Sequence, residues 1–388
     1  MSVNKSIINL IGVSLGTYNV KSLLVAVLIA SLVLSSSLTI IPAEAKQESK
    51  RVLAFTDEEA KNAVSQGCKV VLETRGLKAL VCNPVVADAL GLQEDIQMFA
   101  VDAGANQQIG ANIVQSNGNT GSGRVIAILD TGYNYNHQEL SDSYQGGIDY
   151  VNGDDYPLDD NGHGSHVAGL ITANGVYPSA KGVAPAAGII AVKVLDSSGS
   201  GRFSTVLAGI NYVLDNYPNV DAISMSLGSS KTFKGTCDNY MPTMTTAINN
   251  ALSKGIIVVI AAGNSGNAGV SFPGCISSAL TVGAVDKNDY IASFSGRGSA
   301  VDVTAPGVSL ISSWFGATNS YNSASGTSMA TPVVSGTVAL IKSAHPTWSP
   351  TQVINAIKST AKDLGTIGPD STYGSGRIDA DKAVNYSQ

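Results

Sequence analysis

The sequence is poor in charged residues. Of its 388 residues only 13% are Asp, Glu, Lys or Arg, and the formal net charge is −6. Proteins that bind nucleic acid carry basic clusters, so we expect no nucleic-acid partner. Aromatic residues are also few, at 6%, whereas glycine is abundant, with 41 residues. This composition is typical of an α/β protein with tight turns and close backbone approaches.

Long apolar runs are missing, except for one near the N-terminus. Lys5 and Lys21 precede the apolar run 23–34, and an A-x-A sequence follows at 43–45. A basic segment, a short apolar run and an A-x-A site are typical of a secretory signal peptide. The alternative is a membrane anchor, for which the run is short. We therefore expect a signal peptide in residues 1–45 and a secreted protein.

The sequence has only four cysteines and no C-x-x-C pair that would favour zinc. In an exported protein, four cysteines suggest two disulfides, for which three pairings exist. Cys68 and Cys82 flank a predicted hairpin and lie opposite each other, where cross-strand neighbours can bond. This pairing leaves Cys237 for Cys275. Free thiols are the alternative.

Residues 46–100 have the element order of a small α+β domain. We predict strands at 52–55, 69–73, 77–81 and 95–101, and helices at 57–65 and 85–90. This β-α-β-β-α-β order is the split βαβ pattern. Fewer than 60 residues form a marginal core. Because the segment stands between a signal peptide and a larger domain, we interpret it as a propeptide.

Residues 101–388 alternate apolar strands with helices. We predict strands at 125–129, 188–194, 222–226, 256–261 and 280–285, and helices at 164–173, 204–214, 241–254 and 327–344. Such a pattern predicts an α/β fold with a doubly wound, mostly parallel sheet and helices on both faces. Active sites in these sheets lie at the carboxyl ends of strands. Polar residues that follow a strand are therefore the first candidates.

Asp130 directly follows the strand 125–129 and begins a D-T-G triplet. An acid at the end of a buried strand is well placed to orient a base. The triplet also occurs in aspartic proteases, but these need two carboxylates that share a proton. The sequence has no second D-T-G or D-S-G. The remaining alternative is a helix-capping Asp.

His163 stands at the start of an apolar helix, within NGHGSHVAG at 161–169. A general base must be exposed on one side and fixed on the other, and the neighbouring glycines permit close backbone approach. His166, one turn further on, is the competing base, which we expect to be structural. A zinc site would favour three residues between the two histidines and a clear third ligand.

Ser328, within GTSMATP at 326–332, begins a helix whose positive end and free N–H groups favour a developing negative charge. Asn264, within AAGNSG at 261–266, follows a strand and can donate an amide hydrogen bond to the same charge. Taken alone, Ser328 is an ordinary helix cap and Asn264 a turn residue. A G-x-S-x-G string at 12–16 lies in the targeting segment, and we treat it as chance.

These motifs together resemble the subtilisin family of serine proteases. The matching strings are ILDTG, NGHGSHVAG, SMSLG, AAGNSG and GTSMATP, in the order Asp…His…Ser, and the resemblance covers about residues 105–388. It implies that Asp130 orients His163, which takes the proton from Ser328. Ser328 then attacks the peptide carbonyl to form an acyl-enzyme, and Asn264 holds the oxyanion. Residues 46–100 resemble the family's inhibitor-like propeptide more loosely.

The resemblance also implies a substrate that binds as an extended strand between two backbone segments. These segments are Gly199-Ser200-Gly201 and Ser226-Leu227-Gly228. The pocket for P1, the residue before the cleaved bond, would lie between Ser226-Leu227-Gly228 and Ala262-Gly263-Asn264, with Ser271 at its floor. None of these residues is charged. We therefore expect an endopeptidase of broad specificity that prefers apolar or aromatic P1 residues.

We expect the chemistry to need no cofactor. Many relatives bind structural calcium beside the loop that follows the helix of the catalytic histidine. Here Glu139 supplies an acid, but Val176 stands where an oxygen-bearing side chain is expected. A second, weaker site keeps Asp302 but has Ala300 in place of an acid. Calcium prefers six to eight oxygen ligands, so the sequence does not support structural calcium well.

Polypeptides are the expected substrates, and we expect a monomer. The resemblance implies that the enzyme cuts its own precursor near residues 99–105 and that the propeptide assists folding and blocks the site. Two alternatives remain: a maturation protease with one dedicated substrate, and an inactive descendant of the fold that binds peptides. The four intact chemical positions argue against the inactive descendant.

Overall fold

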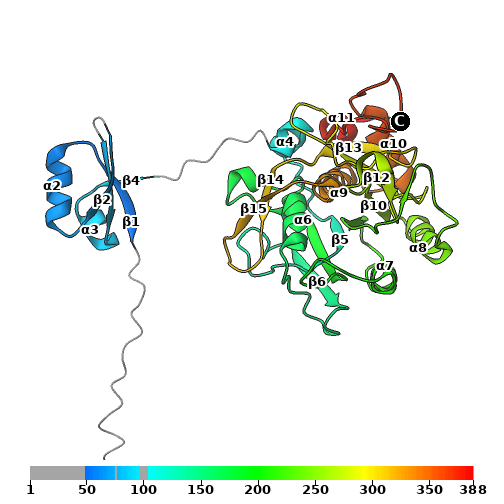
Figure 1. Ribbon diagram of the computed structural model, residues 1–388, viewed down its shortest axis with the longest axis horizontal. Helices are drawn as coiled ribbons and strands as arrows, with labels where there is room; N and C mark the ends of the chain where they lie inside the picture. The colour runs from blue at the N-terminus through cyan, green and yellow to red at the C-terminus, as the bar shows by residue number, and fades with distance from the viewer. Residues whose placement is uncertain (1–48, 75–76, 96–103, 388) are drawn as a thin grey trace, which may run out of the picture. The chain divides into compact units, whose positions relative to one another are not determined.

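The computed structural model describes residues 49–74, 77–95 and 104–387. The chain divides into two compact units, residues 1–99 and 100–388 (Figure 1). This division falls next to residue 100, the predicted end of the propeptide. The predicted signal peptide lies outside the described residues. Among the helices that are described, none has the length and apolar character needed to cross a membrane.

In its described residues, the first unit is a four-stranded antiparallel sheet with two helices, and its strand order is β2-β3-β1-β4. Its elements are β1 (Lys50–Ala54), α2 (Asp57–Ser65), β2 (Lys69–Thr74), β3 (Leu77–Cys82), α3 (Pro84–Ala89) and β4 (Gln93–Glu94). The predicted helices and first three strands are confirmed. The prediction for the last strand is wrong in its start, because β4 precedes residue 95; residues 96–101 lie outside the described part of the chain.

Both predicted disulfides are confirmed. Cys68 bonds Cys82 across the β2–β3 hairpin, where a register shift within β2 brings the two residues opposite each other. Cys237 bonds Cys275 in the second unit.

The second unit is built on a seven-stranded parallel sheet with the order β13-β12-β10-β8-β5-β7-β6. These strands are β5 (Val125–Asp130), β6 (Tyr144–Asp149), β7 (Gly188–Lys193), β8 (Ala222–Met225), β10 (Ile257–Ala261), β12 (Leu280–Val285) and β13 (Val303–Pro306). The five predicted strands are the central ones. In this order β5 lies between β7 and β8, so later strands of the chain are added on both sides of β5. Folds of this kind place their sites at the carboxyl ends of the strands where the strand order reverses in this way.

Side chains of β5 alternate between the two hydrophobic cores. Ile126 and Ile128 face one core, and Ala127 and Leu129 face the other. The first core also contains α4 (Ala105–Gln108), α5 (Ala111–Ser116), α6 (His163–Thr172), α9 (Thr327–Ala344), α10 (Pro350–Thr360) and α11 (Ala380–Val384). The second contains α7 (Phe203–Asn216) and α8 (Pro242–Ser253). Helices therefore cover both faces, as predicted (Figure 1).

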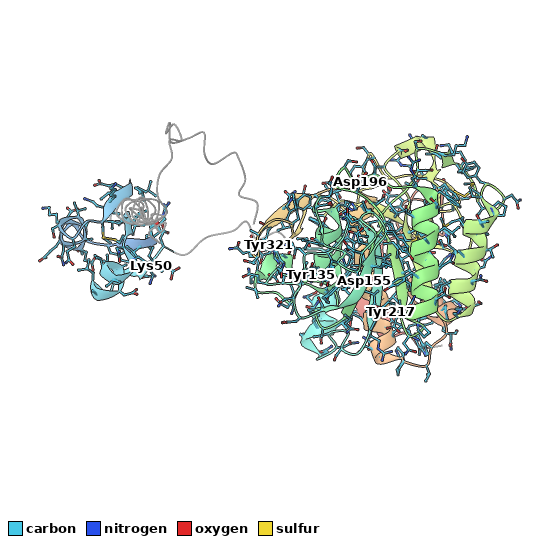
Figure 2. All side chains as sticks on the ribbon, turned by 90° about the horizontal axis from the view of Figure 1, so that it is seen from below. Lys50, Tyr135, Asp155, Asp196, Tyr217 and Tyr321 are labelled. Atoms are coloured by element: carbon cyan, nitrogen blue, oxygen red, sulfur yellow. A yellow bond between two sulfur atoms is a disulfide. The ribbon has the colours of Figure 1, made fainter. Side chains whose placement is uncertain are left out.

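The edge strands β6 and β13 were not predicted, because neither contains a continuous apolar run. In β6 a Cβ atom on Gly146 would lie 2.9 Å from the hydroxyl of Tyr217, and one on Gly147 would lie 1.8 Å from the carbonyl oxygen of Ala191. The strand thus needs two glycines where an apolar pattern would place large side chains. Figure 2 labels Tyr217 beside this edge. In β13 the sequence V-T-A-P is short and ends in proline.

Two small antiparallel sheets complete the unit outside the main sheet. One pairs β9 (Thr232–Phe233) with β11 (Val270–Ser271), and the other pairs β14 (Leu310–Ser313) with β15 (Tyr321–Ala324). Two short 3₁₀ helices cover 178–180 and 266–268.

Candidate active site

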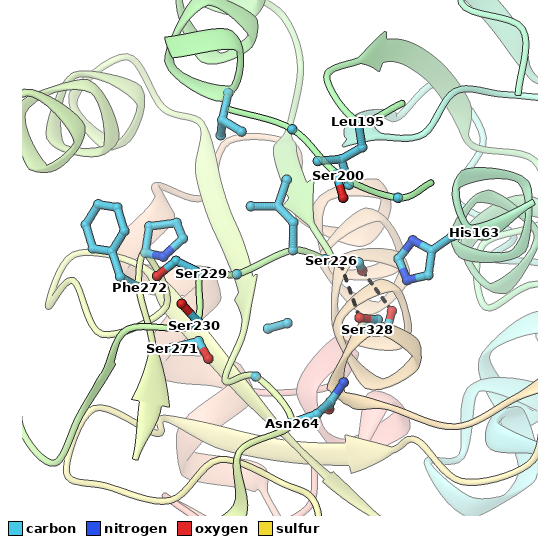
Figure 3. A pocket seen from close by; sticks show the side chains of 18 of the residues that line it. His163, Leu195, Ser200, Ser226, Ser229, Ser230, Asn264, Ser271, Phe272 and Ser328 are labelled. Carbon is cyan, nitrogen blue, oxygen red and sulfur yellow. Dashed lines mark hydrogen bonds between the residues drawn. The ribbon is translucent and has the colours of Figure 1, made fainter. Parts of the chain in front are cut away.

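Asp130 and His163 are in direct contact. Asp130 ends β5 and is 1% exposed, and its Oδ1 lies 2.7 Å from Nδ1 of His163, the first residue of α6. The same oxygen accepts a hydrogen bond from the backbone N–H of Thr131 at 2.7 Å. Burial lowers the pKa of His163, but the charge of Asp130 and its hydrogen bond raise the pKa by more than burial lowers it. The pKa therefore lies above the ordinary value of 6.5. The ring extends into the cleft (Figure 3).

The loop before His163 is held by the buried carboxylate of Asp159. It accepts hydrogen bonds from the N–H groups of Asn161, Gly162 and Ser165 and from the hydroxyl of Ser165. Two of these four donors are the residues directly before His163. The start of α6 is therefore fixed before any substrate is present.

Glycine is required on both sides of His163. Gly162 has φ of 111°, and a Cβ there would lie 2.3 Å from the indole of Trp314. A Cβ on Gly164 would lie 2.1 Å from the carbonyl oxygen of Gly132, in the turn after Asp130. This close approach, predicted from the sequence, lets α6 begin directly against the end of β5.

His166 is part of the interior. It is fully buried, and its Nε2 donates to the backbone carbonyl oxygens of Leu310 at 3.0 Å and Asn322 at 3.1 Å. Burial lowers its pKa to about 4, so the ring is neutral. His166 is thus structural, as predicted. Within the described ranges, no group of three or more His, Cys, Asp or Glu side chains is arranged to hold a metal ion.

Ser328 is the second residue of α9 and contacts Ser226. Its hydroxyl donates to the carbonyl oxygen of Ser226 at 3.2 Å, and the Ser226 hydroxyl donates to the carbonyl oxygen of Ser328 at 2.8 Å (Figure 3). His163 lies beside this pair in the same cleft. Although both residues belong to the described part of the chain, no hydrogen bond joins Ser328 to His163 here.

The side-chain amide of Asn264 is oriented by Thr327. Its Oδ1 accepts hydrogen bonds from the backbone N–H of Thr327 at 2.9 Å and from the Thr327 hydroxyl at 3.1 Å. Because the oxygen is occupied, the NH₂ group faces Ser328 (Figure 3). The hydroxyl oxygen of Thr327 in turn accepts a hydrogen bond from the N–H of Gly263 at 3.0 Å. The group that orients the Asn264 amide is therefore itself held in place.

A cleft of about 800 Å³ contains most of the predicted site residues. His163, Asn264 and Ser328 line it, as do Gly199, Ser200, Gly201, Ser226, Leu227, Gly228, Gly263 and Ser271. Asp130 and Ala262 do not line the cleft, because both are buried behind it. Of the predicted wall segment 262–264, Gly263 and Asn264 line the cleft, whereas Ala261 lines it in place of Ala262.

Sequence reasoning missed several apolar residues of the cleft and a permanently charged one. The missed lining residues include Leu195, Phe203, Val206, Met244 and Phe272, and the charged one is Arg202. Phe203 and Val206 are one turn apart at the start of α7, where an apolar pair signals an inward-facing stripe. No signal in the sequence points to Met244 or Phe272, because they come from segments far from the recognised motifs.

Ser271 lies between the two backbone segments of the predicted P1 pocket. A Cβ on Gly263 would lie 2.2 Å from the Ser271 hydroxyl oxygen, and one on Gly228 would lie 3.0 Å from the Ser271 Cβ. The two glycines therefore approach this side chain as closely as backbone permits. In Figure 3 Ser271 lies away from His163, at the other end of the cleft.

Glu139 does not fit a calcium site in this chain. The side chain is 1% exposed, and its carboxylate accepts from the N–H groups of Gly175 at 2.7 Å and Tyr177 at 2.6 Å. It also accepts from the N–H of Val176 and the hydroxyl of Tyr321, which Figure 2 labels. Calcium requires oxygen lone pairs, whereas this loop directs hydrogen-bond donors at the carboxylate.

Asp302 does not fit a calcium site either. Its Oδ1 lies 2.6 Å from the ammonium group of Lys358, and its Oδ2 accepts from the N–H of Thr281 at 2.9 Å. A lysine thus provides the positive charge at this position.

Comparisons with known proteins agree with this geometry. A family model described as "Subtilase family" matches residues 121–376. An "Alkaline protease" of Shouchella clausii is 36% identical over 386 residues, which cover 92% of this chain and 96% of that protein. "Subtilisin Savinase" of Lederbergia lenta is 41% identical over 277 residues, with 71% and 96% covered. "Subtilisin E" of Bacillus subtilis (strain 168) is 42% identical over 282 residues, with 71% and 70% covered.

The α/β fold, the match of the family model to most of the second unit and the relatives at 36–42% identity lead to one conclusion. The chain belongs to the subtilase family and is a serine endopeptidase.

Proposed function

We propose that this chain is a secreted endopeptidase of broad specificity that prefers apolar or aromatic P1 residues and cuts itself from a precursor. The observation that carries the proposal is the 2.7 Å contact between Asp130 and His163, in a cleft that Ser328 shares. Secretion is supported by the two disulfides, which form in oxidising compartments.

In the proposed reaction, Asp130 selects the tautomer of His163. An Nδ1–H group donated to the carboxylate leaves the lone pair of Nε2 free in the cleft. Rotation about the Ser328 Cα–Cβ bond moves the hydroxyl from the Ser226 carbonyl to Nε2, because hydrogen bonds of catalytic groups often form only with substrate bound. His163 takes the proton as Ser328 attacks the peptide carbonyl, and the Asp130 charge stabilises the imidazolium.

The next steps release two products in turn. His163 returns the proton to the leaving amine, which departs and leaves an acyl-enzyme on Ser328. Water then attacks the ester with His163 again as base, and Ser328 is regenerated. During both attacks the carbonyl oxygen becomes an oxyanion. The amide of Asn264 and the backbone N–H of Ser328, at the N-terminal end of α9, are placed to donate to it.

Broad specificity is supported by the backbone character of the cleft. Two of three residues in 199–201 are glycine, and a substrate strand that pairs with such a segment is held through its main chain. The apolar side chains of Leu195, Val206 and Met244 further favour apolar substrates. Arg202 also lines the cleft, and among the lining residues that belong to the described part of the chain there is no Asp or Glu that would attract a basic P1 side chain.

The first unit supports the role of an intramolecular inhibitor and folding aid. On β2 it exposes Val70, Val71 and Leu72, at 43%, 49% and 53%. Adjacent exposed apolar side chains on a strand usually serve a protein contact. We propose that the first unit inhibits the protease and assists its folding before cleavage, and that the released enzyme acts as a monomer.

Replacement of Ser328 by alanine tests the proposal as a whole. We expect wild-type enzyme to react with a serine-directed phosphonylating reagent, to degrade denatured casein and to lose its first unit. Ser328→Ala should remain unlabelled, leave casein intact and stay full length. Labelled wild type that leaves casein intact would favour a dedicated maturation protease, and unlabelled wild type would favour an inactive peptide-binding protein. Cleavage mainly after Arg or Lys contradicts the proposed P1 preference.

Asn264→Ala should lower kcat by about 100–1,000-fold with little change in KM, because one oxyanion donor is lost. Ser265→Ala is the matched control, since Ser265 is an exposed neighbour of Asn264 in the same cleft, and it should retain wild-type kcat. Steady-state kinetics with one peptide substrate give kcat and KM for wild type and both variants. A rise in KM with unchanged kcat would mean that Asn264 binds substrate and not the oxyanion.

The pH profile should reflect the raised pKa of His163. Only neutral His163 can accept the Ser328 proton, so kcat/KM should fall as the pH is lowered through this pKa, with a midpoint above 6.5. Asp130→Asn removes the charge that raises the pKa; activity should drop by about 10⁴-fold, and the midpoint of the residual activity should move to lower pH. A wild-type midpoint below 6.5 would contradict this assignment.

We further propose that no calcium is bound at Glu139 or Asp302, and thermal melting with and without a chelator tests it. The chelator should leave the melting temperature unchanged. Glu139→Gln removes a charge that accepts several hydrogen bonds and should cost about 2 kcal/mol, or roughly 4–8 °C. Asp142→Asn, at an exposed position nearby, should melt like wild type. A melting temperature that drops with chelator in wild type but not in Glu139→Gln would locate an ion at Glu139 after all.

A further inference from the structure

The Cys237–Cys275 disulfide joins the two segments that close the P1 end of the cleft. One segment contains β9 and the other contains β11, and Ser271 pairs with Thr232 in this small sheet. Next to the disulfide, the N–H of Cys237 donates to the carbonyl oxygen of Cys275 at 2.9 Å. Cys275 follows Ser271, the predicted pocket floor, by four residues.

Hydrogen bonds connect these segments all the way to the pocket. The N–H of Ser229, directly after Gly228, donates to the carbonyl oxygen of Phe272 at 2.7 Å, and the N–H of Phe272 donates to that of Lys231 at 3.0 Å. Both Ser229 and Phe272 line the cleft (Figure 3). One end of this ladder therefore borders the pocket, and the disulfide closes the other end.

Other contacts support this wall too, among them hydrogen bonds of Asp238 with Ser277 and packing of Phe272 in the second core. The ring of Phe272 lies 5.3 Å from that of Tyr240, which lies 5.1 Å from Phe233. Tyr240 is 47% exposed, so water lies behind the aromatic layer. The sulfur atoms, in contrast, are buried, with Cys275 fully covered. The disulfide adds a covalent link between the two segments to these contacts.

We propose that the Cys237–Cys275 disulfide is a specificity-determining element of the protease. It holds Ser271 and Phe272 against Gly228 and Gly263, and so fixes the width of the P1 pocket. A large P1 side chain that reaches this wall depends on the disulfide, whereas a small one does not. This inference rests on the proposed P1 pocket, and it assigns the disulfide a positioning role, since the sulfurs touch no substrate.

A purely stabilising role makes a different prediction. A disulfide that closes a loop of this length (the cysteines are 38 residues apart) is expected to stabilise the fold by about 4 kcal/mol through the unfolded chain. Its loss would then reduce the amount of active enzyme but would affect all substrates equally. If the disulfide positions the pocket wall, its loss instead changes the ratio of kcat/KM between substrates, measured per active site that remains.

The experiment compares the double variant C237A/C275A with wild type on two peptides that differ only in Phe or Ala at P1. Active sites are counted with the phosphonylating reagent. We expect the Phe-to-Ala ratio of kcat/KM to fall about tenfold, mainly through KM for the Phe peptide, as for a weakened apolar pocket. Ile357→Ala is the matched control, because it destabilises the buried core at α10, away from the cleft. Its ratio should equal that of wild type.

A ratio that stays unchanged in C237A/C275A while the melting temperature falls as in Ile357→Ala overturns the proposal. If the double variant does not fold, mature wild type is used instead, because after removal of residues 1–103 the two cysteines are the only ones in the chain. A water-soluble phosphine reduces the bond, delivering two electrons while water supplies two protons to the sulfurs and oxygen to the phosphine. Iodoacetamide then blocks both thiols.

Alkylated enzyme with a lowered Phe-to-Ala ratio supports the proposal. Alkylated enzyme with an unchanged ratio, or without any titratable active site, overturns it in favour of a stabilising role. Failure of the proposed function looks different, because untreated wild type would then take up no phosphonylating reagent or would cut after basic residues.

Discussion

The hydrogen bond between Asp130 and His163 requires that the end of a buried strand and the start of a helix touch. A buried carboxylate is costly unless charged or polar groups pair with it, and the histidine is useful as a base only if its other nitrogen stays in the cleft. Both demands are met because Gly164 lets the backbones meet and Asp159 fixes the preceding loop. The fully buried Lys193 adds a third tie, from its ammonium group to the carbonyl oxygens of Thr131 and Leu195 and to the carboxylate of Asp160.

Lys193 also connects the reaction centre with substrate binding. It ends β7, directly beside Asp130 in the parallel register. Leu195, whose carbonyl it binds, lines the cleft just before the segment 199–201. The same ammonium group therefore links the turn after the acid, the loop before the base and the strand that would hold the substrate. A displacement of any one of them would misplace the others, which is why such a site tolerates little error in geometry.

Local patterns in the sequence were enough to predict the centre of the sheet and many of the residues that line the cleft. Central strands such as β5 and β10 are apolar runs; Asp130 ends β5, Asn264 follows β10 by three residues, and His163 and Ser328 lie in the first turns of α6 and α9. Gly146 and Gly147 concealed the edge strand β6, because a strand that needs close approach to Tyr217 has no apolar signature. Tyr321 donates to Glu139 across 182 positions of sequence, and Phe272 reaches the cleft from outside every motif. Contacts of this kind depend on tertiary packing, which no local pattern encodes.

Outside the sheet, surface loops of this protein are held in place by specific contacts. The sheet is buried on both faces, so its strands need no further restraint, whereas surface loops lack such a core. At Glu139 a buried carboxylate accepts from the N–H groups of a loop, at Asp302 the carboxylate pairs with Lys358, and at Cys275 a disulfide joins two segments beside the cleft. Each of these restraints is formed by groups of the protein itself, and each holds a loop at the rim of the fold. In the proposed function the substrate contacts loops and strand ends, so the restraints that stabilise the rim would also set the geometry that the substrate meets.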